Sequence, residues 1–214
     1  MERSELAIVI PAFNEEYSIA KVVVSAMIYG VVIVVDDAST DNTAKIAENA
    51  GATIVAHLSN KGYDGSINSG FIEADKLGCK YVVTIDADGQ HEVTEIAKYI
   101  DAFNSSIDLV LGVRNKYARF SEKVFSLMTR FLYKVKDPLC GMKGYNMSLY
   151  KKIGHFDSYN SIGTELALTS VKNGCLFKEI LVQLNDRQDT SRFGNIILGN
   201  LRIFRAMLLC IFKI

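Results

Sequence analysis

The sequence has no excess of charge of either sign and no cysteine pair with the spacing of a metal or disulfide motif. Lys plus Arg equals Asp plus Glu, at 24 each, so there is no global basic field to attract nucleic acid, and a polyanion site would have to be local. We therefore expect no nucleic-acid partner and no zinc site, in a cytoplasmic protein with reduced thiols. The cysteines are Cys79, Cys140, Cys175 and Cys210.

Long apolar runs are also absent. The opening residues, "MERSELAIVIP", hold an apolar run that is too short for a signal peptide. No stretch of about 18 uninterrupted apolar residues occurs, so we expect no membrane-spanning helix. The chain has 214 residues, of which 49% are hydrophobic and 22% charged, enough for one ordinary domain with a real core.

Strand and helix signals alternate through the first half of the chain. Short β-rich runs are separated by segments with helical apolar spacing, capping residues or a terminal glycine. This alternation predicts an α/β sandwich with a mostly parallel central sheet and helices on both faces. The expected strands are 6–10, 31–37, 52–57, 80–86 and 107–113, and the expected helices are 18–29, 39–51, 64–78 and 93–104.

The pattern becomes irregular after residue 114. We expect a basic amphipathic helix over 118–136, a turn-rich segment over 137–145 that leads to a strand, a short helix over 163–174 and a strand over 175–184. The chain shows no linker or repeat, so one domain over 1–194 is expected. Residues 195–214 form an amphipathic C-terminal helix in this prediction.

Three acidic clusters, "PAFNEE", "DDASTD" and "DADGQHE", follow three of the expected strands. Ligands of such sheets bind beyond the carboxyl ends of the strands. Asp86 and Asp88 stand at i and i+2 of an extended chain, and two close carboxylates need a counter-charge. Mg²⁺ or Mn²⁺ would supply it and would take substrate phosphates as further ligands. The alternative is a solvated loop or a helix cap.

The usual nucleotide-binding loops are missing, since the chain has no GxGxxG and no GxxxxGK[ST] after the first strand. Asp36 and Asp37 end another apolar strand, where a carboxylate can accept hydrogen bonds from ribose hydroxyls or a base N–H. The alternative is that Asp36, Ser39 or Asp41 caps the following helix. A phosphate site would have to depend on a metal ion and basic side chains.

Five ordered motifs carry a family resemblance: "IPAFNEE", "VVDDASTDNT", "NKGYDGSINSG", "TIDADGQHE" and "LVLGVRN". In order and spacing they resemble family 2 glycosyltransferases of the GT-A fold, and especially the dolichyl- or polyprenyl-phosphate sugar synthases. The resemblance covers residues 5–115 and continues more loosely through "DPLCGMKGY", "GTELAL" and "DRQDTSRFG". It implies a GT-A-type, Rossmann-like sandwich that binds a GDP- or UDP-hexose.

The resemblance also implies roles for single residues. Asp37 would lie near the base or ribose, and Phe13 stands where this group often has tyrosine, so a stacking contact is kept without the hydroxyl. The metal ion would be held by Asp86 and Asp88, with Gln90 as a further ligand. The implied nucleotide-binding set is Pro11, Phe13, Glu15, Val35, Asp37, Asp86, Ala87, Arg187 and Arg192.

Arg114 matches a basic residue of the family that faces the diphosphate or the acceptor, and Arg187 and Arg192 match a later basic segment that closes on the phosphates. Family members invert the anomeric centre in one displacement. Metal at Asp88 and arginine at position 114 would then stabilise the leaving group, which makes both catalytic in this interpretation.

The acceptor decides whether a base is needed. A sugar hydroxyl usually needs a carboxylate to take its proton, whereas a lipid phosphate is already ionised. Glu165 in "GTELAL" is the first candidate for the base and Asp137 the second; the alternative for Glu165 is a helix N-terminal acid. Many hydroxyl-directed relatives have a Glu-Asp pair where this chain has Glu165 and Leu166. That difference favours a polyprenyl-phosphate acceptor over a glycan.

Two basic and apolar segments, 118–136 and 195–214, suit a bilayer interface. We expect a peripheral contact at the cytoplasmic face of a membrane, the alternative being a packed core or oligomer helix. The sequence does not predict the oligomeric state. Two other functions compete: a nucleotidyltransferase, which the acidic "PAFNEE" loop disfavours, and a non-catalytic sugar-nucleotide-binding module.

Overall fold

The computed structural model describes residues 1–184 and 196–214. Within these residues seven strands form one sheet in the order β3-β2-β1-β4-β6-β5-β7. Every neighbouring pair is parallel except β4 with β6 and β5 with β6, so β6 alone runs against the others. The strands are β1 (Leu6–Ala12), β2 (Val31–Asp36), β3 (Thr53–Ala56), β4 (Tyr81–Thr84), β5 (Leu109–Arg114), β6 (Lys143–Asn146) and β7 (Phe177–Val182).

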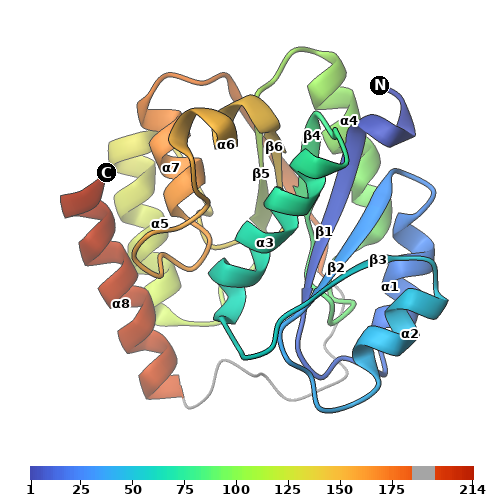
Figure 1. Ribbon diagram of the computed structural model, residues 1–214. Helices are drawn as coiled ribbons and strands as arrows, with labels where there is room; N and C mark the ends of the chain where they lie inside the picture. Colours follow the sequence, from blue (N-terminus) through green and yellow to red (C-terminus); the bar gives the residue numbers. More distant parts are fainter. Residues whose placement is uncertain (185–195) are drawn as a thin grey trace.

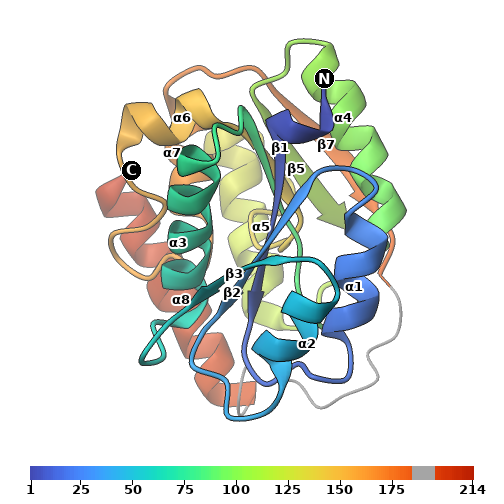
Figure 2. The same ribbon diagram turned by 45° about the vertical axis from the view of Figure 1, so that its right-hand side comes forward.

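Helices cover both faces of the sheet (Figures 1 and 2). Side chains of α1, α2 and α4 pack with one face, and side chains of α3, α5, α6, α7 and α8 pack with the other. The helices are α1 (Ile19–Ala26), α2 (Thr43–Asn49), α3 (Gly62–Lys76), α4 (Ile96–Asn104), α5 (Phe120–Tyr133), α6 (Met147–Ile153), α7 (Glu165–Lys172) and α8 (Ile196–Lys213), with short 3₁₀ turns η1 (Arg3–Glu5) and η2 (Val93–Glu95).

This architecture confirms the predicted α/β sandwich with a mostly parallel sheet. The apolar runs became strands because their side chains are buried on both faces, as in β1, where six of seven residues are buried. Two features differ from the sequence prediction. Helix α6 was not expected, and β6, expected only as a strand after a turn-rich segment, inserts antiparallel between β4 and β5.

The strand order brings the three acidic clusters together. Strands β2, β1 and β4 are consecutive neighbours and parallel, so their carboxyl ends share one edge of the sheet. "DDASTD", "PAFNEE" and "DADGQHE" follow these three ends. The edge therefore collects acidic loops from segments that are far apart in the chain.

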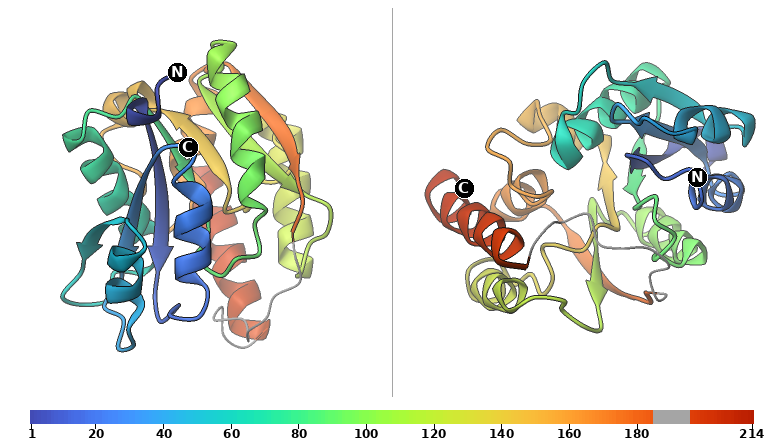
Figure 3. Two further views of the ribbon diagram at one scale, coloured as in Figure 1. Left: turned by 90° about the vertical axis from the view of Figure 1, so that its right-hand side faces the viewer. Right: turned by 90° about the horizontal axis from the view of Figure 1, so that it is seen from below.

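Helix α8 lies beside α5 on the outside of the molecule, as Figure 1 and both views of Figure 3 show. Three of its side chains, Ile203, Ala206 and Cys210, are buried in the same apolar cluster as Phe125 of α5. The opposite sides of both helices expose large apolar residues, among them Phe131 at 80% and Phe212 at 83%. Among the described residues, no helix combines the length and apolarity required to span a bilayer.

Candidate functional site

The loops after β1 and β2 are locked to each other by side chains. Asn14 has a positive φ of 54°, a conformation that asparagine tolerates better than most residues. Its backbone N–H donates to Ser39 Oγ at 2.9 Å, and its Oδ1 accepts from Thr40 N at 2.8 Å. The next N–H, of Glu15, donates to the buried Thr43 Oγ1 at 2.7 Å. These bonds hold the two acidic loops as one rigid rim of the strand-end edge.

The expected nucleoside contacts lie on this rim with different accessibility. Phe13 keeps 38% of its surface exposed on this rim. Pro11 is half-buried, and Glu15 is 9% exposed with Oε2 accepting from Ser18 Oγ at 3.0 Å. Val35 and Ala87 are buried in the two apolar clusters, so only their backbone atoms could contact a ligand.

Asp37 is committed to the protein's own loops. Its carboxylate is buried and contacts His57 Nδ1 at 2.7 Å, and it accepts the backbone N–H of Lys61 at 2.7 Å and of Gly62 at 2.8 Å. These contacts join the end of β2 to the start of α3. The neighbouring Asp36 has a buried Oδ1 with no hydrogen-bond partner in residues 1–184 and 196–214. That atom is closed off from solvent, so a ligand could reach it only if the side chain moved.

Asp86 stands just beyond β4, with 36% of its side chain exposed. A Cβ built on Gly141 would lie 2.3 Å from Asp86 Oδ2, so the carboxylate occupies space that only a glycine leaves open. His91 Nε2 is 3.6 Å from the same oxygen. Burial raises the pKa of Asp86. His91 lowers it, and the negative charge of the nearby Asp88 adds to the rise. A cation beside Asp86 would relieve this unfavourable ionisation.

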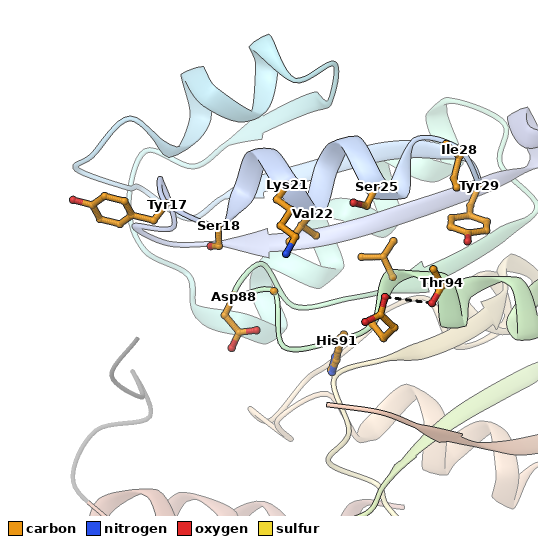
Figure 4. A pocket seen from close by; sticks show the side chains of 13 residues that line it. Tyr17, Ser18, Lys21, Val22, Ser25, Ile28, Tyr29, Asp88, His91 and Thr94 are labelled. Atoms are coloured by element: carbon orange, nitrogen blue, oxygen red, sulfur yellow. Dashed lines mark hydrogen bonds between the residues drawn. The ribbon is translucent and has the colours of Figure 1, made fainter. Parts of the chain in front are cut away.

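Asp88 and Gln90 follow in the same loop. The Gln90 backbone N–H donates to Asp88 Oδ1 at 3.0 Å, which turns the chain after the acidic pair. Asp88 also stands at one end of a cavity of about 590 Å³ between α1 and residues 88–94 (Figure 4). Both ring nitrogens of His91, which also lines the cavity, are buried without a hydrogen-bond partner among the described residues.

The donor set at this edge fits a divalent ion that is completed by substrate. No group of three or more His, Cys, Asp or Glu side chains arranged to hold a metal occurs in the described part of the chain. Two carboxylates, with the amide of Gln90 next in sequence, would leave several coordination positions to phosphate oxygens and water, as Mg²⁺ commonly has. Asp86 and Asp88 are the two residues that could hold the ion.

Arg114, at the end of β5, is bound by two acidic side chains rather than pointing freely at the edge. Its Nε donates to Asp137 Oδ2 at 2.7 Å and its Nη2 to Asp137 Oδ1 at 2.9 Å, a bidentate pair. Glu122 Oε2 is 3.3 Å from the same Nη2. Burial alone would lower the pKa of Arg114, but the bonds to Asp137 outweigh it and raise the pKa.

Neither expected base is free to act as one. Asp137 is 1% exposed and both its oxygens accept from Arg114. Glu165 is 8% exposed and accepts from Ser158 N at 2.5 Å and Ser158 Oγ at 2.7 Å, with His155 Nε2 at 3.0 Å. The carboxylate of Glu165 closes the loop before α7, so the alternative of a structural acid at the start of that helix suits the geometry better.

Lys143 on β6 is a residue that the sequence analysis overlooked. It is 2% exposed, and its ammonium makes no hydrogen bond or ion pair among the described residues. Burial lowers the pKa of Lys143, while Asp137 and Asp86 raise it. A lysine inside a turn-rich "CGMKGY" segment looks like a solvated side chain, and only the sheet order reveals that it is buried. The predicted Arg187 and Arg192 lie outside the described residues.

Comparison with known proteins decides the family. The model of Glycosyl transferase family 2 matches residues 7–165, well over half of the chain. The chain belongs to family 2 of the glycosyltransferases. It is therefore an enzyme that transfers a sugar, as the motif order had predicted.

Three curated relatives of this family 2 glycosyltransferase are matched over most of their length. An uncharacterised protein of Methanocaldococcus jannaschii is 27% identical over 99% of this chain and 95% of its own. The UDP-N-acetylglucosamine–dolichyl-phosphate N-acetylglucosaminyltransferase of Methanococcus voltae is 28% identical over 97% of this chain and 96% of its own. A dolichyl-phosphate hexose transferase of Haloferax volcanii is 25% identical over 86% of this chain and 84% of its own.

Solved structures show the same fold. Glucosyl-3-phosphoglycerate synthase of Mycobacterium tuberculosis, in complex with Mn²⁺, UDP and phosphoglyceric acid, superposes with a TM-score of 0.73. The match covers 96% of this chain and 78% of that protein at 17% sequence identity. The same synthase with Mg²⁺ and UDP gives a TM-score of 0.70. The fold of this family 2 glycosyltransferase is the GT-A fold.

Proposed function

We propose that this glycosyltransferase moves a hexose from a GDP- or UDP-sugar to a polyprenyl phosphate, with inversion at the anomeric carbon and with Mg²⁺ or Mn²⁺ as cofactor. The observation that carries the proposal is the carboxylate of Asp86, seated against Gly141 at the edge where the ends of β2, β1 and β4 meet. Its curated relatives support the acceptor, since two of them are named as dolichyl-phosphate sugar transferases.

In this proposal the donor's nucleoside lies along the rim formed by the loops after β1 and β2. The ring of Phe13, which is 38% exposed, stacks on the base. Asp86 and Asp88, with Gln90, would hold the divalent ion. When bound, that ion supplies positive charge to the leaving diphosphate, a contribution of several kcal/mol.

The occupied carboxylates favour an acceptor that needs no base. Asp137 and Glu165 both accept hydrogen bonds inside the protein, so neither is poised to take a proton from a hydroxyl. A phosphate monoester arrives ionised and attacks without proton transfer. The paired Arg114 then contributes by fixing the end of β5 rather than by meeting the phosphates directly.

The proposal includes a peripheral membrane contact through α5 and α8. Both helices bury one side and expose large apolar side chains on the other, next to cations that suit anionic head groups. We propose that residues 1–194 are the catalytic domain and that 195–214 serve this contact. The exposed apolar residues are Phe120, Leu127, Phe131, Leu132, Ile197, Leu198, Leu201, Leu208, Ile211 and Phe212, and the exposed cations include Lys123, Arg130, Arg202 and Lys213.

A transfer assay tests the proposed function. The purified protein is incubated with each of a panel of labelled GDP- and UDP-sugars, Mn²⁺ and a polyprenyl phosphate, and the label is extracted into organic solvent. We expect label in the lipid fraction with one nucleotide, none with EDTA, and none for Asp88→Ala, whereas Asp101→Ala, a loss of an exposed carboxylate on α4, should keep full activity. Label on a glycan and none on lipid would show that the acceptor is a glycan and not a polyprenyl phosphate. No transfer to either would overturn the proposal.

A further inference from the structure

Lys143 is 2% exposed, and its ammonium forms no ion pair among residues 1–184 and 196–214. The residue pairs through its backbone with Thr84, the last residue of β4, and with Leu111 of β5, so it lies on an interior strand beside the carboxyl end of β4. Thr84 Oγ1 donates to Gly141 O at 2.6 Å and accepts from Lys143 N at 3.2 Å, which ties β6 firmly to β4. The lysine is therefore held in position by the sheet and is 2% exposed.

Acidic groups surround this ammonium without pairing with it. Asp86, Asp64 and Asp137 all interact with it electrostatically, yet none comes within 4 Å of Nζ in the described residues. Cys140 and Arg114 also act on Lys143, and the backbone before α7 is close, because a Cβ built on Gly163 would lie 3.6 Å from Nζ. A buried charge that lacks a partner is unfavourable for folding, and such a group usually serves a ligand.

The position of Lys143 indicates which ligand. The proposed nucleoside rim is built on β2 and β1, on one side of β4, and Lys143 stands on β6, on the other side. Alternation along β6 puts its side chain on the same face as Tyr145, the face that α3, α5, α6, α7 and α8 cover. The side chain thus lies on this face beside the carboxyl end of β4, near the backbone at Gly163 before α7.

We propose that Lys143 Nζ binds the phosphate of the acceptor, an assignment that rests on the proposed transfer to a lipid phosphate. An acceptor oxygen held there attacks the anomeric carbon, a new carbon–oxygen bond forms, and the bond to the diphosphate breaks. The bonding electrons leave with the nucleoside diphosphate. No proton moves, which agrees with the hydrogen bonds that Asp137 and Glu165, the two expected bases, accept inside the protein.

Steady-state kinetics of three variants test this role. In Lys143→Met and Lys143→Gln we expect the KM for a short-chain prenyl phosphate to rise about tenfold or more, because a charge-assisted hydrogen bond is lost. The KM for the sugar nucleotide and its slow hydrolysis without acceptor should stay within about twofold of the wild type. Lys143→Arg, which keeps the charge, should recover part of the acceptor affinity.

A stability measurement separates this role from a structural one. Methionine removes an unpaired buried charge at similar volume, so we expect Lys143→Met to melt at the wild-type temperature or above it. Two kinetic results would overturn the proposal: a raised KM for the donor with the acceptor unchanged, or no change in either. Loss of folding in Lys143→Met and Lys143→Gln together would also overturn it.

A binding measurement without donor distinguishes the role of Lys143 from the proposed transfer reaction. Calorimetric titration of the full chain with the same prenyl phosphate, without donor, should show binding that Lys143→Met weakens about tenfold. If the wild type binds prenyl phosphate but transfers no sugar to it, the proposed function fails and the site of Lys143 stands. If both proteins bind it equally, Lys143 is not the phosphate ligand.

Discussion

The carboxylate of Asp86 occupies the space that a side chain at position 141 would need. A Cβ on Gly141 would come within 2.3 Å of Asp86 Oδ2 and 2.7 Å of Oδ1, far closer than real Cβ atoms approach an oxygen. The turn-rich segment before β6 therefore fixes how the acidic end of β4 faces the shared edge. This contact joins the proposed metal site to the strand that carries Lys143.

Gly141→Ala should move Asp86 and impair transfer while leaving the fold intact. Because the proposed metal geometry depends on this carboxylate, we expect kcat/KM to fall between about tenfold and a hundredfold, as when the support of a metal ligand is lost. The measurement is the transfer assay, with circular dichroism to verify folding. In an Asp86→Ala background the alanine at 141 should cause no further loss, and equal losses in both backgrounds would disprove the coupling.

Asp137→Asn should destabilise the protein. Arg114 is 15% exposed at its side chain and would lose the charge of its bidentate partner, and breaking such a buried pair costs about 3–5 kcal/mol. Urea denaturation measures the loss, with the exposed Asp101→Asn as the control for charge removal. A variant that unfolds like the control but has no activity would mean that Asp137 acts in catalysis after all.

Asp64 should make stability depend on pH in a defined window. Burial, with the nearby Asp157, raises the pKa of Asp64 to about 6 from an ordinary value of 3.8. Between these two values the folded protein binds the proton more tightly than the unfolded chain, so this contribution to stability is present at low pH and is lost as the pH rises toward 6. Above pH 6 the carboxylate of Asp64 is charged, and hydrogen bonds from Ile162 N and Gly163 N stabilise it in its buried position.

The test for Asp64 compares the wild type with Asp64→Asn from pH 4 to 7. As the pH rises from 4 to 6, the wild type should lose free energy of unfolding relative to Asp64→Asn. Above pH 6 the difference between the two proteins should stay constant. Asp101→Asn, at an exposed site, should show no such slope. A constant difference across the whole range would show that Asp64 titrates normally.

The apolar sides of α5 and α8 should govern membrane binding. Phe131 and Phe212 are 80% and 83% exposed, and burying a phenylalanine in an apolar phase is worth about 1.5–3 kcal/mol. The double variant Phe131→Asp, Phe212→Asp should bind vesicles of anionic phospholipid at least about tenfold more weakly in flotation assays. Leu58→Asp, which changes a fully exposed leucine after β3, is the matched control and should float like the wild type. If the wild type, the double variant and Leu58→Asp all float equally, α5 and α8 do not form the membrane contact.

Much of the fold could be predicted because the local signals were consistent. The apolar runs that became β1, β2 and β4 are bounded by helical segments, and glycines with positive φ follow α2 and α3 at positions 51 and 78. The insertion of β6 could not be predicted, because its pairing partners are distant in sequence. Lys143 pairs with Thr84 of β4, about 60 residues earlier, and with Leu111 of β5, about 30 residues earlier. Helix α6 was missed because its seven residues are too few for a clear apolar period.

The site was predicted unevenly for a similar reason. Residue type and spacing predict a metal site at Asp86 and Asp88, because these two residues are close in sequence. They do not show that Asp137, 23 residues away in sequence, binds Arg114, or that Glu165 is occupied by Ser158. A charged side chain acquires partners only through tertiary structure, so the sequence overstates how many are free for chemistry.

The central claim is that Asp86 and Asp88 hold a divalent ion together with the donor's diphosphate. The most direct measurement is a titration of Mn²⁺ followed by electron paramagnetic resonance, with and without UDP or GDP, on the wild type and Asp88→Ala. We expect that one of these nucleotides tightens Mn²⁺ binding to the wild type and has no such effect on the variant. Mn²⁺ binding that neither nucleotide changes, or that survives unaltered in Asp88→Ala, would contradict it.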